Sequence, residues 1–151
     1  MYKTMLQPDL IGLDFQETNQ LNLFQSVSKI LLLKGYVTET YLESLIERER
    51  QFPTGLQTRY LNIALPHTDP EVINHPFIFV VRNSQQITML QMGDNSETPC
   101  RHFLFLGIKD PKSQVGLLAK LMDLFSKEDF VSHFAQIDDE AAMYQLLSSH
   151  L

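Results

Sequence analysis

Hydrophobic periodicity in the first third of the chain predicts one strand and two helices. Residues 11–15 alternate between apolar and polar and predict a short edge strand, preceded by a loosely attached lead-in over residues 1–10 that contains Pro8. Residues 19–34 carry apolar side chains at helical spacing and end at a glycine, so they predict a helix. A second amphipathic pattern predicts a helix over residues 40–50.

Strand-like segments dominate the middle of the chain. The segment 61–65 alternates and stops at Pro66, which has no N–H to donate to a neighbouring strand. Further apolar runs predict three more strands, over residues 77–82, 87–91 and 102–108. We expect a turn at residues 83–84 between the first two of these strands. The run 77–81 is apolar on both faces, which is typical of a central strand covered by helices.

Three helices are predicted to close the chain, beginning near Asp110, Ser126 and Asp138. Asp110 is followed by a proline at the first helical position, and the expected apolar stripe of that helix is Leu118, Leu121, Met122 and Phe125. The order of helices, strands and helices indicates an α/β fold. We expect a single-domain sandwich over residues 1–151, with a mixed, mostly central β-sheet flanked by helices.

Composition narrows the class of protein. The 151 residues are 44% hydrophobic and include ten phenylalanines, which indicates a packed core. The net charge of −6 argues against a nucleic-acid partner, because phosphate binding needs basic patches. Cys100 is the only cysteine, so neither an intrachain disulfide nor a cysteine zinc cluster is possible. No apolar run approaches the roughly 20 residues of a membrane span, and we expect a cytoplasmic protein without direct membrane insertion.

His67 is the strongest candidate for chemistry. It lies in the segment Pro66-His67-Thr68-Asp69, directly after a predicted strand. Open α/β sheets commonly place ligand crevices at the carboxyl ends of their strands. No serine or cysteine motif accompanies His67, so the imidazole itself is the candidate reactive group. The alternative is a loop histidine without chemistry.

Three pieces of sequence around His67 resemble a known signature. They are Arg48-Glu49, Phe52-Pro53-Thr54-Gly55 and Ile63-Ala64-Leu65-Pro66-His67. Their order resembles that of the enzyme IIA components of the sugar phosphotransferase system, in the mannitol/fructose-type fold family. The FPTG spacer and the separation of Arg48 from His67 are most similar to the galactitol-type members. The resemblance runs through nearly the whole chain.

The resemblance implies a phosphocarrier. His67 would accept a phosphoryl group from the histidine phosphocarrier HPr and pass it to a cysteine of the cognate IIB component, which works with the IIC membrane permease. Neutral imidazole suits this chemistry, because its ring nitrogen is nucleophilic near neutral pH. The resemblance implies no metal or organic cofactor.

Arg48 and Thr54 are the expected supporting residues. The fixed donor fork of a guanidinium can hold phosphoryl oxygens, and phosphoryl transfer depends mostly on positioning and charge stabilisation. The hydroxyl of Thr54 and the amide of Gly55 could contact the same oxygens, or could simply form the turn. An exposed helix-end arginine is the alternative for Arg48.

Gln114 marks a departure from the broader family. Mannitol- and fructose-type members often carry a second active-site histidine at the start of the helix after the last strand. Aligning residues 109–125 with that helix by their apolar stripe places Gln114 there, as in galactitol-type members. Its amide can donate a hydrogen bond but cannot carry a proton charge, and the first helical turn also favours an anion. An ordinary polar surface residue is the alternative.

Other features leave alternatives open. We expect no chemistry from His75, His102, His133 and His150. A metal site formed by His67, Asp69 and His75 fits no known ligand spacing. Phe52, Leu56 and Leu65 either form an apolar docking patch around His67 or belong to the core. A regulatory IIA-like module that signals phosphorylation state to a protein partner is the alternative function, and a hydrolase lacks the required nucleophile and base.

Overall fold

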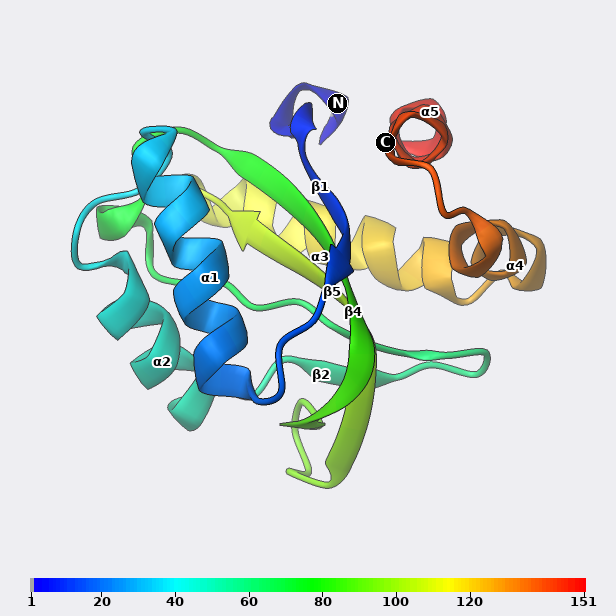
Figure 1. Ribbon diagram of the computed structural model, residues 1–151, viewed down its shortest axis with the longest axis horizontal. Helices are drawn as coiled ribbons and strands as arrows, with labels where there is room; N and C mark the ends of the chain where they lie inside the picture. Colours follow the sequence, from blue (N-terminus) through cyan, green and yellow to red (C-terminus); the bar gives the residue numbers. More distant parts are fainter. Residues whose placement is uncertain (1) are drawn as a thin grey trace.

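One mixed five-stranded sheet forms the centre of the protein, whose computed structural model describes residues 2–151 (Figure 1). The strand order is β1-β4-β5-β3-β2. The strands are β1 (Leu6–Phe15), β2 (Gly55–Gln57), β3 (Asn62–Ala64), β4 (Phe77–Leu90) and β5 (Glu97–Gly107). β1 is parallel to β4 and β3 is parallel to β5, whereas the pairs β4–β5 and β2–β3 are antiparallel. The predicted mixed sheet is therefore confirmed.

Five helices cover the two faces of this sheet. They are α1 (Gln20–Leu33), α2 (Tyr41–Gln51), α3 (Pro111–Phe125), α4 (Glu128–Gln136) and α5 (Glu140–His150). Two short 3₁₀ helices also occur, η1 (Tyr2–Met5) before β1 and η2 (Pro70–Val72) between β3 and β4. Figure 1 shows α1 and α2 together on one face and α3, α4 and α5 on the other. None of the helices within residues 2–151 combines the length and apolar character that a membrane span requires.

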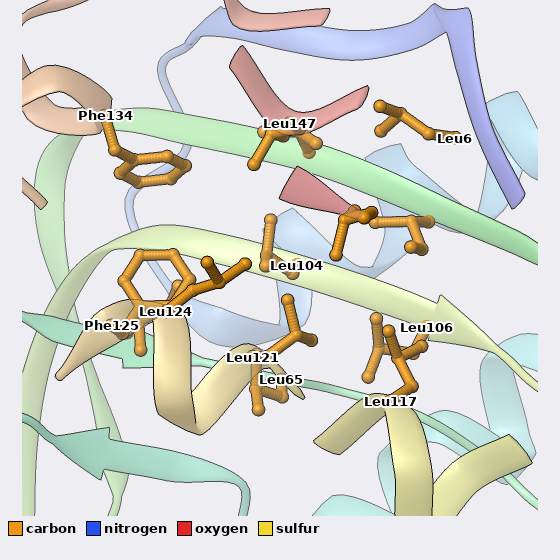
Figure 2. Close-up of a cluster of buried hydrophobic side chains, with 14 of the residues drawn as sticks. Leu6, Leu65, Leu104, Leu106, Leu117, Leu121, Leu124, Phe125, Phe134 and Leu147 are labelled. Atoms are coloured by element: carbon orange, nitrogen blue, oxygen red, sulfur yellow. The ribbon is translucent and has the colours of Figure 1, made fainter. Parts of the chain in front are cut away.

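The alternation of β4 and β5 produces two separate cores. Ile78 and Leu106 point to the cluster beneath α3, α4 and α5, part of which Figure 2 shows. Phe79 and Phe105 point the other way, to the cluster beneath α1 and α2. Burying one such side chain stabilises the fold by about 1.5–3 kcal/mol. The expected central strand, apolar on both faces, is confirmed.

The start of the chain differs from the prediction. β1 begins at Leu6 rather than at residue 11, and Leu6 and Leu10 are both buried. Pro8 lies inside β1, which is tolerated because β1 is an edge strand whose outer N–H groups have no partner strand. The loosely attached lead-in is therefore wrong for residues 2–10, and residue 1 lies outside the described residues.

The turn predicted at residues 83–84 is also wrong. β4 is one continuous strand whose pairing with β5 becomes irregular between Arg82 and Ile87. Asn83 is fully buried there, and its side-chain amide accepts from the Glu17 N–H and donates to the Glu17 carbonyl. A polar side chain that resembles a turn residue instead ties the end of β1 to β4. The short strand β2 was not predicted.

The C-terminal helices follow the prediction with local corrections. Asp110 caps α3 by accepting from the Lys112 N–H, as its position before Pro111 indicates. Met122 is 45% exposed, so its assignment to the buried stripe is wrong, and Leu117 and Leu124 are buried instead. Ser126, which was predicted to begin the next helix, instead ends α3, and its hydroxyl donates to the Asp123 carbonyl.

The pairing of β3 with β5 determines which strand ends lie together at one edge of the sheet. β3 and β5 are parallel, so their carboxyl ends lie at the same edge of the sheet. α3 begins at Pro111, shortly after β5 ends at Gly107. The segment after β3 and the N-terminus of α3 therefore share one edge, and this edge carries the candidate site.

Candidate active site

Backbone pairing fixes His67 against the end of β5. His67 forms an isolated parallel bridge with Leu106, and the Leu106 N–H donates to the Pro66 carbonyl at 2.9 Å. Leu65 is 1% exposed, and Figure 2 shows it beside Leu121 of α3. Buried packing immediately before His67 therefore holds the imidazole at the shared edge of β3 and β5.

A single hydrogen bond determines the tautomer of His67. Its Nδ1 lies 2.7 Å from the Leu65 carbonyl oxygen. A carbonyl can only accept, so Nδ1 carries the proton and Nε2 carries the lone pair. Nε2 makes no hydrogen bond within residues 2–151 and is not among their fully buried polar atoms. The arrangement presents Nε2 as an available nucleophile.

The surroundings of His67 keep the ring neutral. Burial lowers its pKa below the ordinary value, because the imidazolium would lose its hydration. The nearby Arg48 lowers this pKa further, while the hydrogen bond to Leu65 and the carboxylate of Asp69 partly oppose the change. A neutral imidazole at neutral pH is the form that can attack phosphorus.

Arg48 lies in the last turn of α2 and points toward the His67 segment. Its Nη1 forms an ion pair with Asp69 Oδ1. Its guanidinium also lies over the Phe52 ring, 4.9 Å from the ring centroid, which favours the cation. Arg48 and His67 are thus brought together as the sequence predicts. Asp69 is the partner that sequence reasoning did not assign to Arg48.

Glu49 and Thr54 form a buried, hydrogen-bonded clamp, whereas the sequence suggested that Thr54 and Gly55 either contact phosphoryl oxygens or form the turn. The Thr54 N–H and hydroxyl donate to the two Glu49 carboxylate oxygens at 2.8 and 2.7 Å. Both residues are buried, and burial raises the Glu49 pKa. The Thr54 carbonyl accepts from the Leu65 N–H at 3.1 Å, which supports the segment that holds His67. The N–H and the hydroxyl of Thr54 both donate to Glu49 in this structure. The contact of Thr54 with a phosphoryl group stays a prediction.

The Thr-Gly pair also serves close packing. A Cβ at Gly55 would lie 2.6 Å from the Leu90 carbonyl oxygen, so only glycine fits between β2 and the end of β4. The Gly55 carbonyl accepts from the Met92 N–H at 2.8 Å. Gly55 therefore holds the outer strand β2 against the end of β4. The sequence had suggested that its amide contacts phosphoryl oxygens or that it forms a turn.

Gln114 lies in the first turn of α3, at the same edge of the sheet as His67. It is half-buried and shares a helical face with Leu117 and Leu121, three and seven residues further on. Those two leucines pack toward Leu65 and Leu106 in Figure 2. The Gln114 side chain makes no hydrogen bond within residues 2–151. Its amide is therefore free to serve a ligand at His67, and that role stays a prediction.

The remaining histidines lie elsewhere. His75, His133 and His150 are exposed, and His102 is half-buried inside β5 rather than at its start. Residues 2–151 contain no group of three or more histidine, cysteine or acidic side chains arranged to hold a metal ion.

Among the candidate docking residues, Phe52 is 59% exposed, Leu56 is half-buried and Leu65 belongs to the core.

Comparison with known proteins identifies the family. Residues 4–150 match the family described as the phosphoenolpyruvate-dependent sugar phosphotransferase system, EIIA 2. The chain belongs to this family. The EIIA chain is 26% identical over 120 residues to the galactitol-specific EIIA components of Escherichia coli K12 and of E. coli O157:H7. This alignment covers 80% of the chain and 79% of each relative. The predicted relationship to galactitol-type EIIA proteins is confirmed.

Solved structures show the same fold. Nitrogen regulatory protein IIA-Ntr from Neisseria meningitidis matches with a TM-score of 0.79 and 18% identity, over 96% of this chain and 97% of that one. IIA mannitol from E. coli matches with a TM-score of 0.74 and 17% identity, over 93% and 97%. IIA mannitol in a complex with phosphorylated IIB mannitol matches with a TM-score of 0.77 and 15% identity, over 95% and 99%. The EIIA chain is therefore a component of the sugar phosphotransferase family with the mannitol-type IIA fold.

Proposed function

We propose that this EIIA protein carries a phosphoryl group on Nε2 of His67, between phospho-HPr and a cysteine of its cognate IIB component. The IIB component would pass the group to a galactitol-like sugar as the IIC permease imports it. The carrier works in the cytoplasm, where its phosphoryl donor and acceptor meet. Family membership and the galactitol-specific relatives support this proposal.

The hydrogen bond from His67 Nδ1 to the Leu65 carbonyl is the observation that carries the proposal. It leaves the Nε2 lone pair as the single nucleophilic position on the ring. In the loading step Nε2 bonds to phosphorus while the P–N bond to the donor imidazole breaks. The electron pair of the broken bond returns to the donor ring, and Nδ1 of His67 keeps its proton throughout. The second transfer reverses these roles, with a cysteine thiolate as the attacking group.

Charge at the edge of the sheet favours the phosphoryl group. Arg48 supplies guanidinium donors that can hold two phosphoryl oxygens at once. The Gln114 side-chain amide in the first turn of α3 can add a further donor, and the helix dipole favours an anion there, although Asp110 already accepts from the Lys112 N–H at this end. Thr54 contributes mainly by holding Leu65, and through it His67, in position. These groups position and stabilise the transferring phosphoryl group without any cofactor.

Partner docking would use the surface around His67. Phe52 is exposed and contacts Arg48, and Val115, the residue after Gln114, is 72% exposed, so exposed apolar side chains accompany both supporting residues. Exposed apolar groups of this kind suit a protein that binds two partners transiently in turn. A related IIA mannitol protein forms a complex with phosphorylated IIB mannitol, which supports a IIB partner here.

Reconstitution tests the proposal. The protein is incubated with enzyme I, HPr and phosphoenolpyruvate, and its intact mass is measured with and without HPr. We expect a gain of one phosphoryl group that requires HPr and is lost when a galactitol-type IIB component is added. No mass gain would refute the phosphocarrier function, and a gain that persists with IIB present would refute the assigned acceptor.

A further inference from the structure

Arg48 is held by an anion that belongs to the protein itself. Within residues 2–151 the bond to Asp69 is the only side-chain hydrogen bond of its guanidinium, and the buried Nε has no partner. The Asp69 side chain does not cap η2, although its backbone stands at the N-cap position. Among the described residues the Asp69 carboxylate therefore has one hydrogen-bond partner, which is Arg48.

The ion pair lies close enough to the His67 ring to act on its charge. Asp69 follows His67 by two residues, and both members of the pair act electrostatically on the His67 ring. The Arg48 side chain is 25% exposed and that of Asp69 is 61% exposed. The Phe52 ring supports the guanidinium from the other side and does not compete for its N–H donors. Arg48 can thus change its hydrogen-bond partner without leaving its place in the fold.

We propose that Asp69 is a positioning residue that holds Arg48 in the unphosphorylated site and releases it to the phosphoryl group on His67. This inference rests on the function proposed above. A phosphoryl group carries more charge and more acceptor oxygens than a carboxylate, so it wins the guanidinium. Phosphorylation must still break the bond between Arg48 and Asp69, and it places a second anion beside the carboxylate. Both effects keep the phosphorylated state from becoming too stable to pass its group on.

The equilibrium of the loading step tests this inference. The protein is mixed with phosphorylated HPr until the phosphorylated fractions of both proteins, read by intact mass, stop changing. Asp69→Asn should raise the loading equilibrium constant by roughly three- to fivefold, because an ion pair on a partly exposed surface is worth at most about fivefold in an equilibrium constant. Asp69→Glu keeps the charge and should stay near the parent value.

Two controls separate exchange from other effects. Asp123→Asn removes a similarly exposed carboxylate, which pairs with Lys127 at the far end of α3, and should change nothing. In an Arg48→Gln background, Asp69→Asn should shift the equilibrium by less than about twofold, because no guanidinium remains to be released. An equal rise with and without Arg48 would reduce Asp69 to simple charge repulsion and overturn the exchange.

The outcomes also separate this inference from the phosphocarrier function. A parent protein that takes up no phosphoryl group would refute the proposed function itself. A parent that is phosphorylated on His67 while Asp69→Asn leaves its equilibrium unchanged, or lowers it, would refute only the exchange between Asp69 and the phosphoryl group.

Discussion

His67 and His102 show that a depressed pKa does not by itself make a phosphoryl site. Burial lowers the pKa of both histidines, and that of His102 falls to about 4. His67 donates from Nδ1 to the Leu65 carbonyl, so its tautomer is fixed. His102 Nδ1 is buried without a partner, and the ring packs against Phe134 at 5.2 Å between centroids. Of these two histidines, only His67 has one defined nucleophilic nitrogen.

The charged groups around the two histidines also differ. His67 lies at the edge of the sheet where α3 begins, and only one of the two Nη groups of the nearby Arg48 makes a hydrogen bond within residues 2–151, to Asp69. His102 lies near the C-terminus of α4, where Arg82 donates to the Phe134 and Ile137 carbonyls. A helix N-terminus attracts an anion and a helix C-terminus repels it. The comparison indicates that available donors, not basicity, distinguish the acceptor.

The largest expected effect comes from exchanging the two histidines for glutamine. His67→Gln should abolish the phosphoryl mass gain, because no other described group combines a fixed lone pair with free cationic donors. His102→Gln should keep it. Intact-mass measurement after incubation with enzyme I, HPr and phosphoenolpyruvate checks both variants. Phosphorylation of His67→Gln at the parent rate would end the assignment.

The two arginines should respond in opposite ways. Arg48→Lys keeps the charge but loses the donor fork, so phosphoryl transfer should slow by roughly 10- to 100-fold with unchanged stability. Arg82→Lys should leave transfer intact and lower the free energy of unfolding by about 1–2 kcal/mol, because the α4 carbonyls lose their hydrogen bonds. Stopped-flow transfer assays and urea denaturation distinguish the two. Equal transfer rates for Arg48→Lys and parent would leave Arg48 as a surface charge.

His102 should make stability depend on pH. Its folded pKa of about 4 lies below the unfolded value near 6.5, so the unfolded chain binds the proton first. The free energy of unfolding should therefore fall between pH 6.5 and pH 4, by on the order of 2 kcal/mol from this residue. Urea denaturation of the parent and of His102→Gln across this range measures the difference. Parallel curves would show that the His102 pKa is the same in the folded and unfolded chains and would contradict this prediction.

The smallest predicted effect concerns Gln114. Losing one hydrogen bond to the phosphoryl group or to His67 costs about 1 kcal/mol, so Gln114→Ala should slow transfer roughly fivefold. Gln114→His should stay active and add a titrating step near neutral pH. Both variants are checked by transfer rates from phospho-HPr, measured between about pH 5.5 and 8.5. This range spans the ordinary histidine pKa of about 6.5. Identical profiles in all three proteins would place Gln114 outside the site.

Local patterns predicted the features that depend on neighbouring residues. The helix over residues 19–34 and the cap at Asp110 follow from periodicity and capping chemistry, and the structure has both. Asn83 was misread because its partner, Glu17, is 66 residues away. Pro8 was misread because only the sheet order shows that its strand is an edge.

The sequence predicted some features of the candidate site and missed others, for the same reason. The sequence signature placed His67 and Arg48 near each other, and the fold brings them together. The signature could not separate the Glu49–Thr54 clamp from a set of phosphoryl ligands, because the hydroxyl direction depends on burial that only the folded chain defines. It also gave no sign of the Arg48–Asp69 pair, which joins α2 to the segment after β3.

Long-range ¹H–¹⁵N spectra of the histidine rings test the central claim most directly. Recorded before and after phosphorylation and across pH, they report which nitrogen of His67 carries the proton and which carries phosphorus. The account predicts a neutral ring protonated on Nδ1, titrating below the ordinary histidine pKa, and a phosphoryl group on Nε2 of His67. A proton on Nε2 of the free ring, or a phosphoryl group on Nδ1 or on another histidine, would contradict it.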